Sequence, residues 1–400
     1  MTLQPHLEKI LESMPYPAFS AQEMGRRHRL LEEAISETGV DHVVLYGTQR
    51  SGTAVPWLTG WPVTREAAVI ITPGERDVLL VQFFNHVPAA REIAASSVVW
   101  WGGPSTIGTA VELLNRRGAA GGRIGVIGAL PHTQHDLLAE AAREVVDLNG
   151  AYTSMRMVKS AEEVDWLRIG AWLSDQAITA LRRQARPGLS EHELVSIIED
   201  AYLSRGGATH IHYLGVTSMT DPNRCVPSQI PSQRRLQEGD VIFSEISASF
   251  WGYPGQVLRT YTVGRGPTPL YGRLHDVASA AYEAIAAVIR AGAHAQDVVD
   301  AAGVIESAGF SIYDDLVHGF GGGYLPPVLG SSSRQNSPVP DFTFRTGMTV
   351  VIQPNVITPD QRAGVQVGEL VLITDDGVES LHTAQRGLLE TLGRDDPGVQ

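Results

Sequence analysis

The chain has 400 residues, a hydrophobic content of 43% and a formal net charge of −13 at pH 7. This length and hydrophobicity suffice for one large or two medium-sized domains. The negative charge argues against binding to nucleic acid or to anionic membranes, because both need clustered Lys and Arg.

Other features of the sequence argue against a membrane span, a secretion signal and a disulfide. No apolar run reaches the roughly 18 residues that a membrane span needs, and the N-terminus lacks the basic and apolar regions of a secretion signal. The single cysteine, Cys225, excludes an intrachain disulfide. We therefore expect a soluble, cytoplasmic protein that binds no nucleic acid and no membrane.

Helices and strands are predicted to alternate over the first part of the chain. Ser20 and Glu23 are spaced as a capping box, an apolar stripe follows them, and Gly39 ends the predicted helix. Buried strands are predicted at DHVVLYG, AAVIITPG, DVLLVQF and GRIGVIG, and a further helix at HDLLAEAAREV. This alternation predicts an α/β domain over residues 1–155.

A second domain is predicted for residues 156–400. The strongest helix signal covers 155–184, where Ser160 and Glu163 form a capping box. A second capped helix, opened by Ser190 and Glu193, runs through Tyr202. Two further helices are predicted at LHDVASAAYEAIAAVIRAG and DVVDAAGVIESAGF. A glycine-rich loop, DDLVHGFGGGYLPPVLG, then leads to predicted strands at TVVIQPNV and ELVLITDDG.

The segment from Gly239 to Gly264 predicts a β-hairpin. Apolar and small or polar residues alternate on both sides of Trp251-Gly252-Tyr253. Glu245 and Gln256 are then expected to lie opposite each other on one face of the sheet. A carboxylate on the buried face of a strand is costly unless it has a partner or a function.

Three phrases resemble the family of creatinase, Xaa-Pro aminopeptidase, prolidase and methionine aminopeptidase. They are the hairpin between Gly-Asp and Arg-Thr, the phrase MRMVKSAEE at 155–163, and His-Gly-Phe-Gly at His318. The resemblance implies an N-terminal creatinase-like α/β domain and a C-terminal pita-bread domain, in which helices cover a curved antiparallel sheet. It also implies a homodimer in which the N-terminal domain of each subunit lies near the active site of the other.

The resemblance also bears on metal binding. The family's peptidases hold two divalent metals with two Asp, one His and two Glu, and these positions fall here at Glu245, Gln256, His318, Gln353 and Gly368. Two metal ions about 3.5–4 Å apart need bridging carboxylates, which neutral amides cannot replace. We therefore predict no dinuclear metal centre and no cofactor. A single metal held by Glu245, His318 and Glu369 is the alternative.

Creatinase resembles this chain in fold but not in its catalytic residues. It works without metal, using a histidine as acid and base, and by resemblance that histidine falls at Ser228. Two of its glutamates fall at Leu258 and Gln353, so creatine is not the expected substrate. Arg65 matches an arginine that reaches the substrate carboxylate of the partner subunit; a solvated arginine at the start of a strand is the alternative.

The predicted catalytic residues are His318 and Glu245, because a shielded carboxyl group beside an imidazole is suited to proton transfer. Alternation in HIHYLG predicts that His210 and His212 share one face, where a structural role is the alternative to function. The predicted substrate-binding residues are Gln256, Gln353, Arg65, Tyr324, Glu369 and His212.

The leading hypothesis is a metal-independent, creatinase-like hydrolase. It would cleave a non-peptide C–N bond in a small, polar, carboxylate-bearing metabolite by acid–base catalysis. Three alternatives stay open: a lyase, cyclase or isomerase on the same fold; a degenerate Xaa-Pro-type metallopeptidase; and a non-catalytic binding protein.

Overall fold

The computed structural model describes residues 2–94, 97–119, 121–335 and 338–393. The chain forms two compact units, Glu12–Arg156 and a unit that joins Met1–Leu11 to Met157–Gln400. No helix within the described ranges is long and apolar enough to cross a membrane.

The N-terminal unit is built on a six-stranded mixed sheet in the order β4-β3-β2-β1-β5-β6. Its strands are β1 (His42–Thr48), β2 (Glu66–Ile71), β3 (Val78–Val81), β4 (Val98–Trp101), β5 (Arg123–Ile127) and β6 (Glu144–Asp147). The helices are α2 (Ala21–Thr38), α3 (Ala54–Thr59), α4 (Val87–Ile93), α5 (Thr106–Arg116), α6 (His132–Ala141) and α7 (Asn149–Met157), with a 3-10 turn η1 (Phe84–His86). Successive residues of β1 enter two different hydrophobic clusters, so the sheet is buried on both faces.

Helix α2 starts and ends as predicted. The Ser20 hydroxyl accepts a hydrogen bond from the Glu23 backbone N–H, and Gly39 ends the helix with a φ of 64°. The Glu23 carboxylate accepts from the side chains of Arg26 and Arg27, which ties the first two turns of the helix together.

The C-terminal unit contains a nine-stranded sheet whose main path is β12-β11-β13-β15-β9-β8-β7. Its strands are β7 (Ala208–Ser218), β8 (Asp240–Phe250), β9 (Tyr253–Thr262), β11 (Val317–Phe320), β12 (Tyr324–Leu329), β13 (Thr349–Ile352), β15 (Gly368–Ile373), β16 (Val378–Ser380) and β17 (Leu389–Glu390). β10 (Ser311–Ile312) and β14 (Val356–Ile357) form a separate pair. All pairs along the main path are antiparallel.

This sheet is strongly curled. β7 and β11 are separated by five strand intervals, which would span about 24 Å in a flat sheet. The rings of His210 on β7 and Phe320 on β11 nevertheless lie only 5.9 Å apart, centroid to centroid. We call the face that bears these two rings the concave face.

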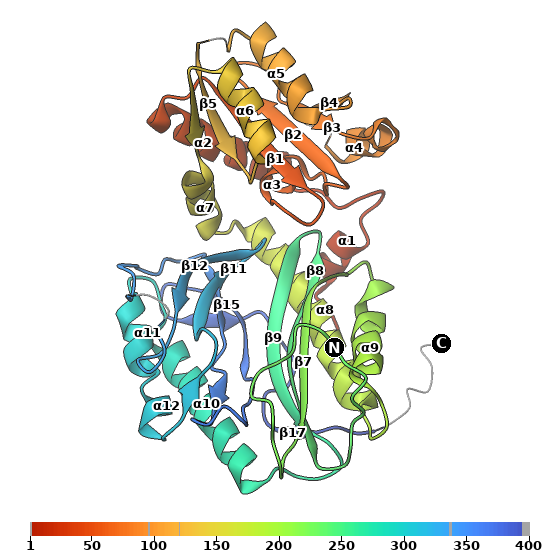
Figure 1. Ribbon diagram of the computed structural model, residues 1–400, viewed down its shortest axis with the longest axis vertical. Helices are drawn as coiled ribbons and strands as arrows, with labels where there is room; N and C mark the ends of the chain where they lie inside the picture. Colours follow the sequence, from red (N-terminus) through yellow and green to blue (C-terminus); the bar gives the residue numbers. More distant parts are fainter. Residues whose placement is uncertain (1, 95–96, 120, 336–337, 394–400) are drawn as a thin grey trace. The chain divides into compact units, whose positions relative to one another are not determined.

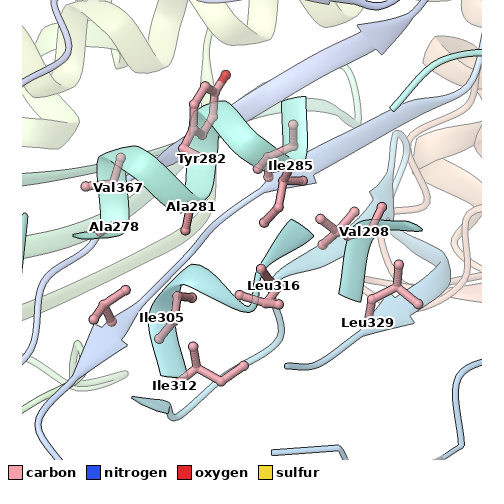
Figure 2. Packing of buried hydrophobic residues seen from close by; sticks show 14 of the residues in the cluster. Ala278, Ala281, Tyr282, Ile285, Val298, Ile305, Ile312, Leu316, Leu329 and Val367 are labelled. Atoms are coloured by element: carbon pink, nitrogen blue, oxygen red, sulfur yellow. The ribbon is translucent and has the colours of Figure 1, made fainter. Parts of the chain in front are cut away.

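Helices cover the other, convex face. The helices that contact strands are α8 (Ala161–Gln184), α9 (Glu191–Leu203), α10 (Pro269–Val288) and α11 (Ala295–Ala301). α1 (Pro5–Leu11) packs on α8, and α12 (Val304–Ser307) packs on α10. Helices α8 and α9 lie beside β7–β9, and α10–α12 lie beside the later strands (Figure 1). Figure 2 shows the apolar packing of α10, α11 and α12 around Leu316, with Ile285, Val298 and Ile305 near it and the ring of Tyr282 pointing away.

Helix α8 packs unusually close to the hairpin. A Cβ at position 255 would lie 2.2 Å from the Cα of Ala171, and a Cβ at Gly170 would lie 2.3 Å from the carbonyl oxygen of Tyr253. The hydroxyl of Ser174 on this helix accepts from the backbone N–H of Ala248 at 2.8 Å. The glycines therefore allow backbone-to-backbone contact, which holds β8 and β9 in place.

Gly255→Ala should destabilise the protein, because the new methyl group would overlap the backbone of α8. We expect the free energy of unfolding to fall by about 3 kcal/mol in urea titrations. Gly272→Ala on α10 is the matched control, since a Cβ there meets nothing within 4 Å; it should stabilise by up to about 1 kcal/mol. Equal stability of the two variants would contradict the packing account.

Candidate active site

The hairpin β8–β9 positions the first two site residues. Its turn residues, Trp251 and Gly252, have φ of 48° and 86°, as a two-residue turn of the primed type requires. The register pairs Glu245 with Leu258 and Ser247 with Gln256. Glu245 and Gln256 thus share the concave face, as predicted, but as diagonal neighbours rather than directly opposite residues. The Nε2 of Gln256 donates to Oε1 of Glu245 at 2.9 Å.

A chain of hydrogen bonds extends from this pair across the sheet. Gln256 Nε2 also donates to Oε1 of Gln353 at 2.9 Å, and Gln353 Nε2 donates to Oδ1 of Asp315. The Tyr324 hydroxyl donates to Oδ2 of Asp315. The chain therefore joins Glu245, Gln256, Gln353, Asp315 and Tyr324, of which only Tyr324 is exposed.

Sequence reasoning missed Asp315. The only signal was an Asp-Asp pair, Asp314 and Asp315, shortly before the histidine of the glycine-rich loop. Only 2% of Asp315 is exposed, and within the described residues no cation lies in ion-pair contact with it. A buried carboxylate without a cation depends on hydrogen-bond donors, which Gln353 and Tyr324 supply.

His318 lies on β11 at a β-bulge and is 1% exposed. Its Nδ1 contacts the carbonyl oxygen of Gly319 at 3.2 Å. Because a carbonyl only accepts, Nδ1 carries the proton and Nε2 carries the lone pair of the neutral ring. Nε2 is buried and makes no hydrogen bond of normal geometry in the described structure, although the Gln353 side chain is close enough to raise the pKa of the ring slightly against the effect of burial. The ring stacks on Tyr324 with centroids 4.0 Å apart, which fixes its plane.

Burial sets the protonation states. It raises the pKa of Glu245 to about 8, with help from the charges of Asp314 and Asp315. It lowers the pKa of His318 to about 4. Burial also raises the pKa of Asp315 to about 6, although bonds from Tyr324 and Gln353 oppose the shift. At neutral pH the site therefore holds a protonated Glu245, a neutral His318 and an ionised Asp315.

No hydrogen bond joins Glu245 directly to His318 within the described part of the chain. Both side chains are on the concave face. Between β8 and β11 in the sheet lie β9, which carries Gln256, and β13, which ends one residue before Gln353. A reacting group placed between Glu245 and His318 would therefore face an acid on one side and a base on the other.

The structure does not bring Glu369 into this cluster. Glu369 pairs with Val257, so its side chain emerges on the convex face. There it accepts from Arg259 at 2.6 Å, from the hydroxyl of Ser380 at 2.7 Å and from that of Tyr282 at 3.3 Å. The predicted substrate contact is corrected to a buried ion pair that ties β9 to β15 and α10.

His212 also lies on the convex face. A bulge between Thr209 and Ile211 shifts the register of β7, so His210 and His212 do not share a face as strict alternation predicts. His212 Nε2 contacts the hydroxyl of Tyr202 on α9 at 2.6 Å. Burial lowers the pKa of His212 to about 4, which fits a packed neutral ring rather than a substrate contact.

Arg65 lies in the N-terminal unit. It is exposed beside a polar hollow of about 330 Å³, which is also lined by Thr48, Gln49, Glu66 and Gln82. A role for Arg65 in binding a substrate carboxylate stays a prediction.

The donor set does not fit a dinuclear metal centre. The amide nitrogen of Gln256 points at both Glu245 and Gln353, so a hydrogen-bond donor occupies the position where metal-bridging oxygens would be needed. A Cβ at Gly368 would lie 2.3 Å from the carbonyl oxygen of Ile352, which leaves no room for a ligand side chain. No group of three or more His, Cys, Asp or Glu in the described ranges is arranged to hold a metal ion.

Comparison with known proteins agrees with the fold. A model of metallopeptidase family M24 matches residues 165–375, and a model of the creatinase/prolidase N-terminal domain matches residues 27–158. The Xaa-Pro dipeptidase of Pyrococcus furiosus is 21% identical over 269 residues, which are 66% of this chain and 75% of that protein. The creatinase of Bacillus sp. (strain B-0618) is 22% identical over 387 residues, covering 91% and 92% of the two chains.

Solved structures share the architecture. The dipeptidase PepE from Mycobacterium ulcerans superposes with a TM-score of 0.78 at 22% identity, covering 93% of this chain and 99% of that one. The X-Pro aminopeptidase from Thermotoga maritima MSB8 gives 0.78 at 18% identity, covering 91% and 99%. The predicted creatinase-like and pita-bread domains, with their curved antiparallel sheet, are confirmed.

Glu245→Gln should change how stability depends on pH. The folded protein keeps the Glu245 proton up to a pH of about 8, whereas the usual pKa is 4.5. Linkage then lowers the free energy of unfolding as the pH rises from about 4.5 to about 8. The variant has no proton to lose at this position. We therefore expect its free energy of unfolding to exceed that of the wild type by a few kcal/mol at pH 8, and by less than about 1 kcal/mol at pH 4.5.

Urea unfolding at both pH values measures this difference. Glu92→Gln, which replaces an exposed glutamate, is the control and should show no such divergence. If the difference in free energy of unfolding between Glu245→Gln and the wild type is equal at the two pH values, Glu245 is not protonated in the folded state.

Proposed function

Because this chain belongs to metallopeptidase family M24 and carries the creatinase/prolidase N-terminal domain, we propose that it is a hydrolase that uses side chains in place of metal ions. Its substrate is a small polar metabolite, and the bond it cleaves is a non-peptide C–N bond. Relatives named as Xaa-Pro dipeptidase and creatinase support hydrolysis. The observation that carries the proposal is the hydrogen-bonded amide chain at the family's metal positions, between a protonated carboxyl group and a neutral imidazole.

The two titratable groups take opposite roles in the reaction. His318 Nε2, the atom with the free lone pair, accepts a proton from water as the water oxygen attacks the carbon of the C–N bond. Glu245 gives its carboxyl proton to the leaving nitrogen, so the amine departs uncharged. The imidazolium of His318 and the carboxylate of Glu245 return to their starting states by proton exchange with solvent after the products leave.

The remaining polar groups orient the substrate. Gln256 keeps its carbonyl oxygen free for a substrate N–H, because both amide hydrogens are used within the chain. The family resemblance supports a homodimer in which Arg65 of the partner subunit binds a substrate carboxylate. These polar groups favour a small polar molecule over an apolar one.

A second candidate is a peptidase of the Xaa-Pro type. The names of the relatives favour it, and the curled sheet is the same as in the solved dipeptidases. The donor set argues against it, because that reaction would need metal ligands at Gln256, Gln353 and Gly368.

Metal content and chelator sensitivity decide between the two candidates. Protein purified without added metal or a chelating tag should contain well below one equivalent of transition metal by mass spectrometry. It should cleave members of a panel of small amides, ureas and amidines equally with and without EDTA, and should leave Xaa-Pro dipeptides intact. One or two equivalents of metal, with activity on dipeptides lost in EDTA, would establish the peptidase instead.

His318→Gln should lower turnover by at least about 100-fold on the substrate found in that panel, because the water would lose its base. The matched control is His192→Gln, an exposed histidine on α9, which should leave turnover within about twofold. Full activity of His318→Gln would remove His318 from the mechanism.

The pH dependence should show which group is the acid. As the pH rises through about 8, Glu245 loses the proton that it must donate, and kcat/KM should fall tenfold per pH unit. A rise in kcat/KM through the same range would identify Glu245 as a base and contradict the assignment.

A further inference from the structure

We propose that Asp315 is a positioning residue that fixes the direction of both glutamine amides and so keeps the Glu245 proton turned toward the reacting group. The proposal rests on the proposed function only where it concerns catalysis. The direction of the amides is a property of the folded protein that can be observed without a substrate.

Asp315 is the one group in the chain whose hydrogen-bonding role is fixed. A primary amide can present either its oxygen or its nitrogen, but an ionised carboxylate only accepts. Asp315 is buried, and its two oxygens receive separate donors, Gln353 Nε2 and the Tyr324 hydroxyl. Gln353 must therefore turn its nitrogen toward Asp315 and its oxygen toward Gln256.

The orientation of the Gln353 amide also fixes which oxygen of Glu245 accepts a hydrogen bond. Because Gln353 presents an oxygen, Gln256 must present its nitrogen, whose two hydrogens reach Gln353 Oε1 and Glu245 Oε1, each at 2.9 Å. Glu245 Oε1 is thereby an acceptor, so the carboxyl proton belongs on Oε2. That oxygen has no hydrogen-bond partner among the described residues, which leaves its proton free for a substrate.

An amide in place of Asp315 removes the constraint. A phenol hydroxyl is a better donor than acceptor, so in Asp315→Asn the amide oxygen stays toward Tyr324 and the amide nitrogen faces Gln353. Gln353 then presents its oxygen to that nitrogen and its own nitrogen to Gln256. Gln256 would in turn face Glu245 with its carbonyl oxygen. Glu245 would have to donate its proton to that oxygen, and the acid would be lost although every catalytic side chain is still present.

A paired set of variants tests this directly. Asp315→Asn combined with Gln353→Glu exchanges the carboxylate and the amide between the two positions without changing the net charge. In that double variant, Gln256 again faces an acceptor and keeps its wild-type direction. Tyr324→Phe is the control for loss of a hydrogen bond to Asp315 alone, and should leave both amides as they are.

Neutron diffraction from deuterium-exchanged crystals gives the amide directions. We expect the deuterons of Gln256 to face Glu245 in the wild type, in Tyr324→Phe and in the double variant, and to face away in Asp315→Asn. Deuterons that still face Glu245 in Asp315→Asn would overturn the proposal, whatever the enzyme catalyses. If Asp315→Asn does not fold, the double variant still tests the proposal, because Gln256 deuterons that face away from Glu245 there would overturn it.

Kinetics in the presence of EDTA tests the catalytic consequence, because a metal bound by the new carboxylate at position 353 then cannot contribute. Asp315→Asn should lower kcat at least about 100-fold with KM changed less than about threefold, and the double variant should recover kcat to within about tenfold of the wild type. Failure of the double variant to recover would overturn the role of Asp315 in positioning Glu245. Absence of metal-free hydrolysis in the wild type would instead overturn the proposed function and leave the neutron result standing.

Discussion

Two carboxyl groups, Glu245 and Asp315, are buried on one face of the C-terminal sheet, and within the described residues neither has a cation in contact. Burying two negative charges in one site is costly, so only one group is kept ionised. Asp315 has the two donors that stabilise its charge, whereas Glu245 accepts a single amide N–H and keeps its proton. His318 is neutral as well, so at neutral pH neither the acid, Glu245, nor the base, His318, carries a charge.

The fold makes this arrangement possible through curvature and two bulges. The curl brings the ring of His210 on the edge strand β7 to within 5.9 Å of the ring of Phe320 on β11, so side chains from distant strands meet on the concave face. The bulge at His318 and Gly319 lets the ring contact the following carbonyl, and this contact sets the tautomer. The bulge in β7 places His210 on the concave face and His212 on the convex face.

The comparison with relatives separates architecture from chemistry. At about 20% identity the chain keeps the two-domain fold of dipeptidases and of creatinase. Its site nevertheless lacks the carboxylates that would bridge two metal ions, and Ser228 stands at the position predicted for creatinase's catalytic histidine. Gly368 shows that the difference is structural as well as chemical, because a Cβ there would lie 2.3 Å from the carbonyl oxygen of Ile352 and 2.8 Å from the Cα of Gln353. Function in such a case has to be argued from the site, since one fold supports many chemistries.

The main helices and strands and the family could be predicted from the sequence alone. Capping boxes at Ser160 and Ser190 form as predicted, the hairpin turns at Trp251, and Glu245 shares a face with Gln256, because each depends on residues close together in the chain. Glu369 leaves the site by plain alternation, because it follows Gly368 of the concave face on β15. The folded structure was needed to show that Asp315 belongs to the site and that His212 does not, because the first depends on contacts with residues distant in the chain and the second on the bulge in β7. A period-two pattern cannot reveal a one-residue shift, and such a shift moves a side chain to the opposite face.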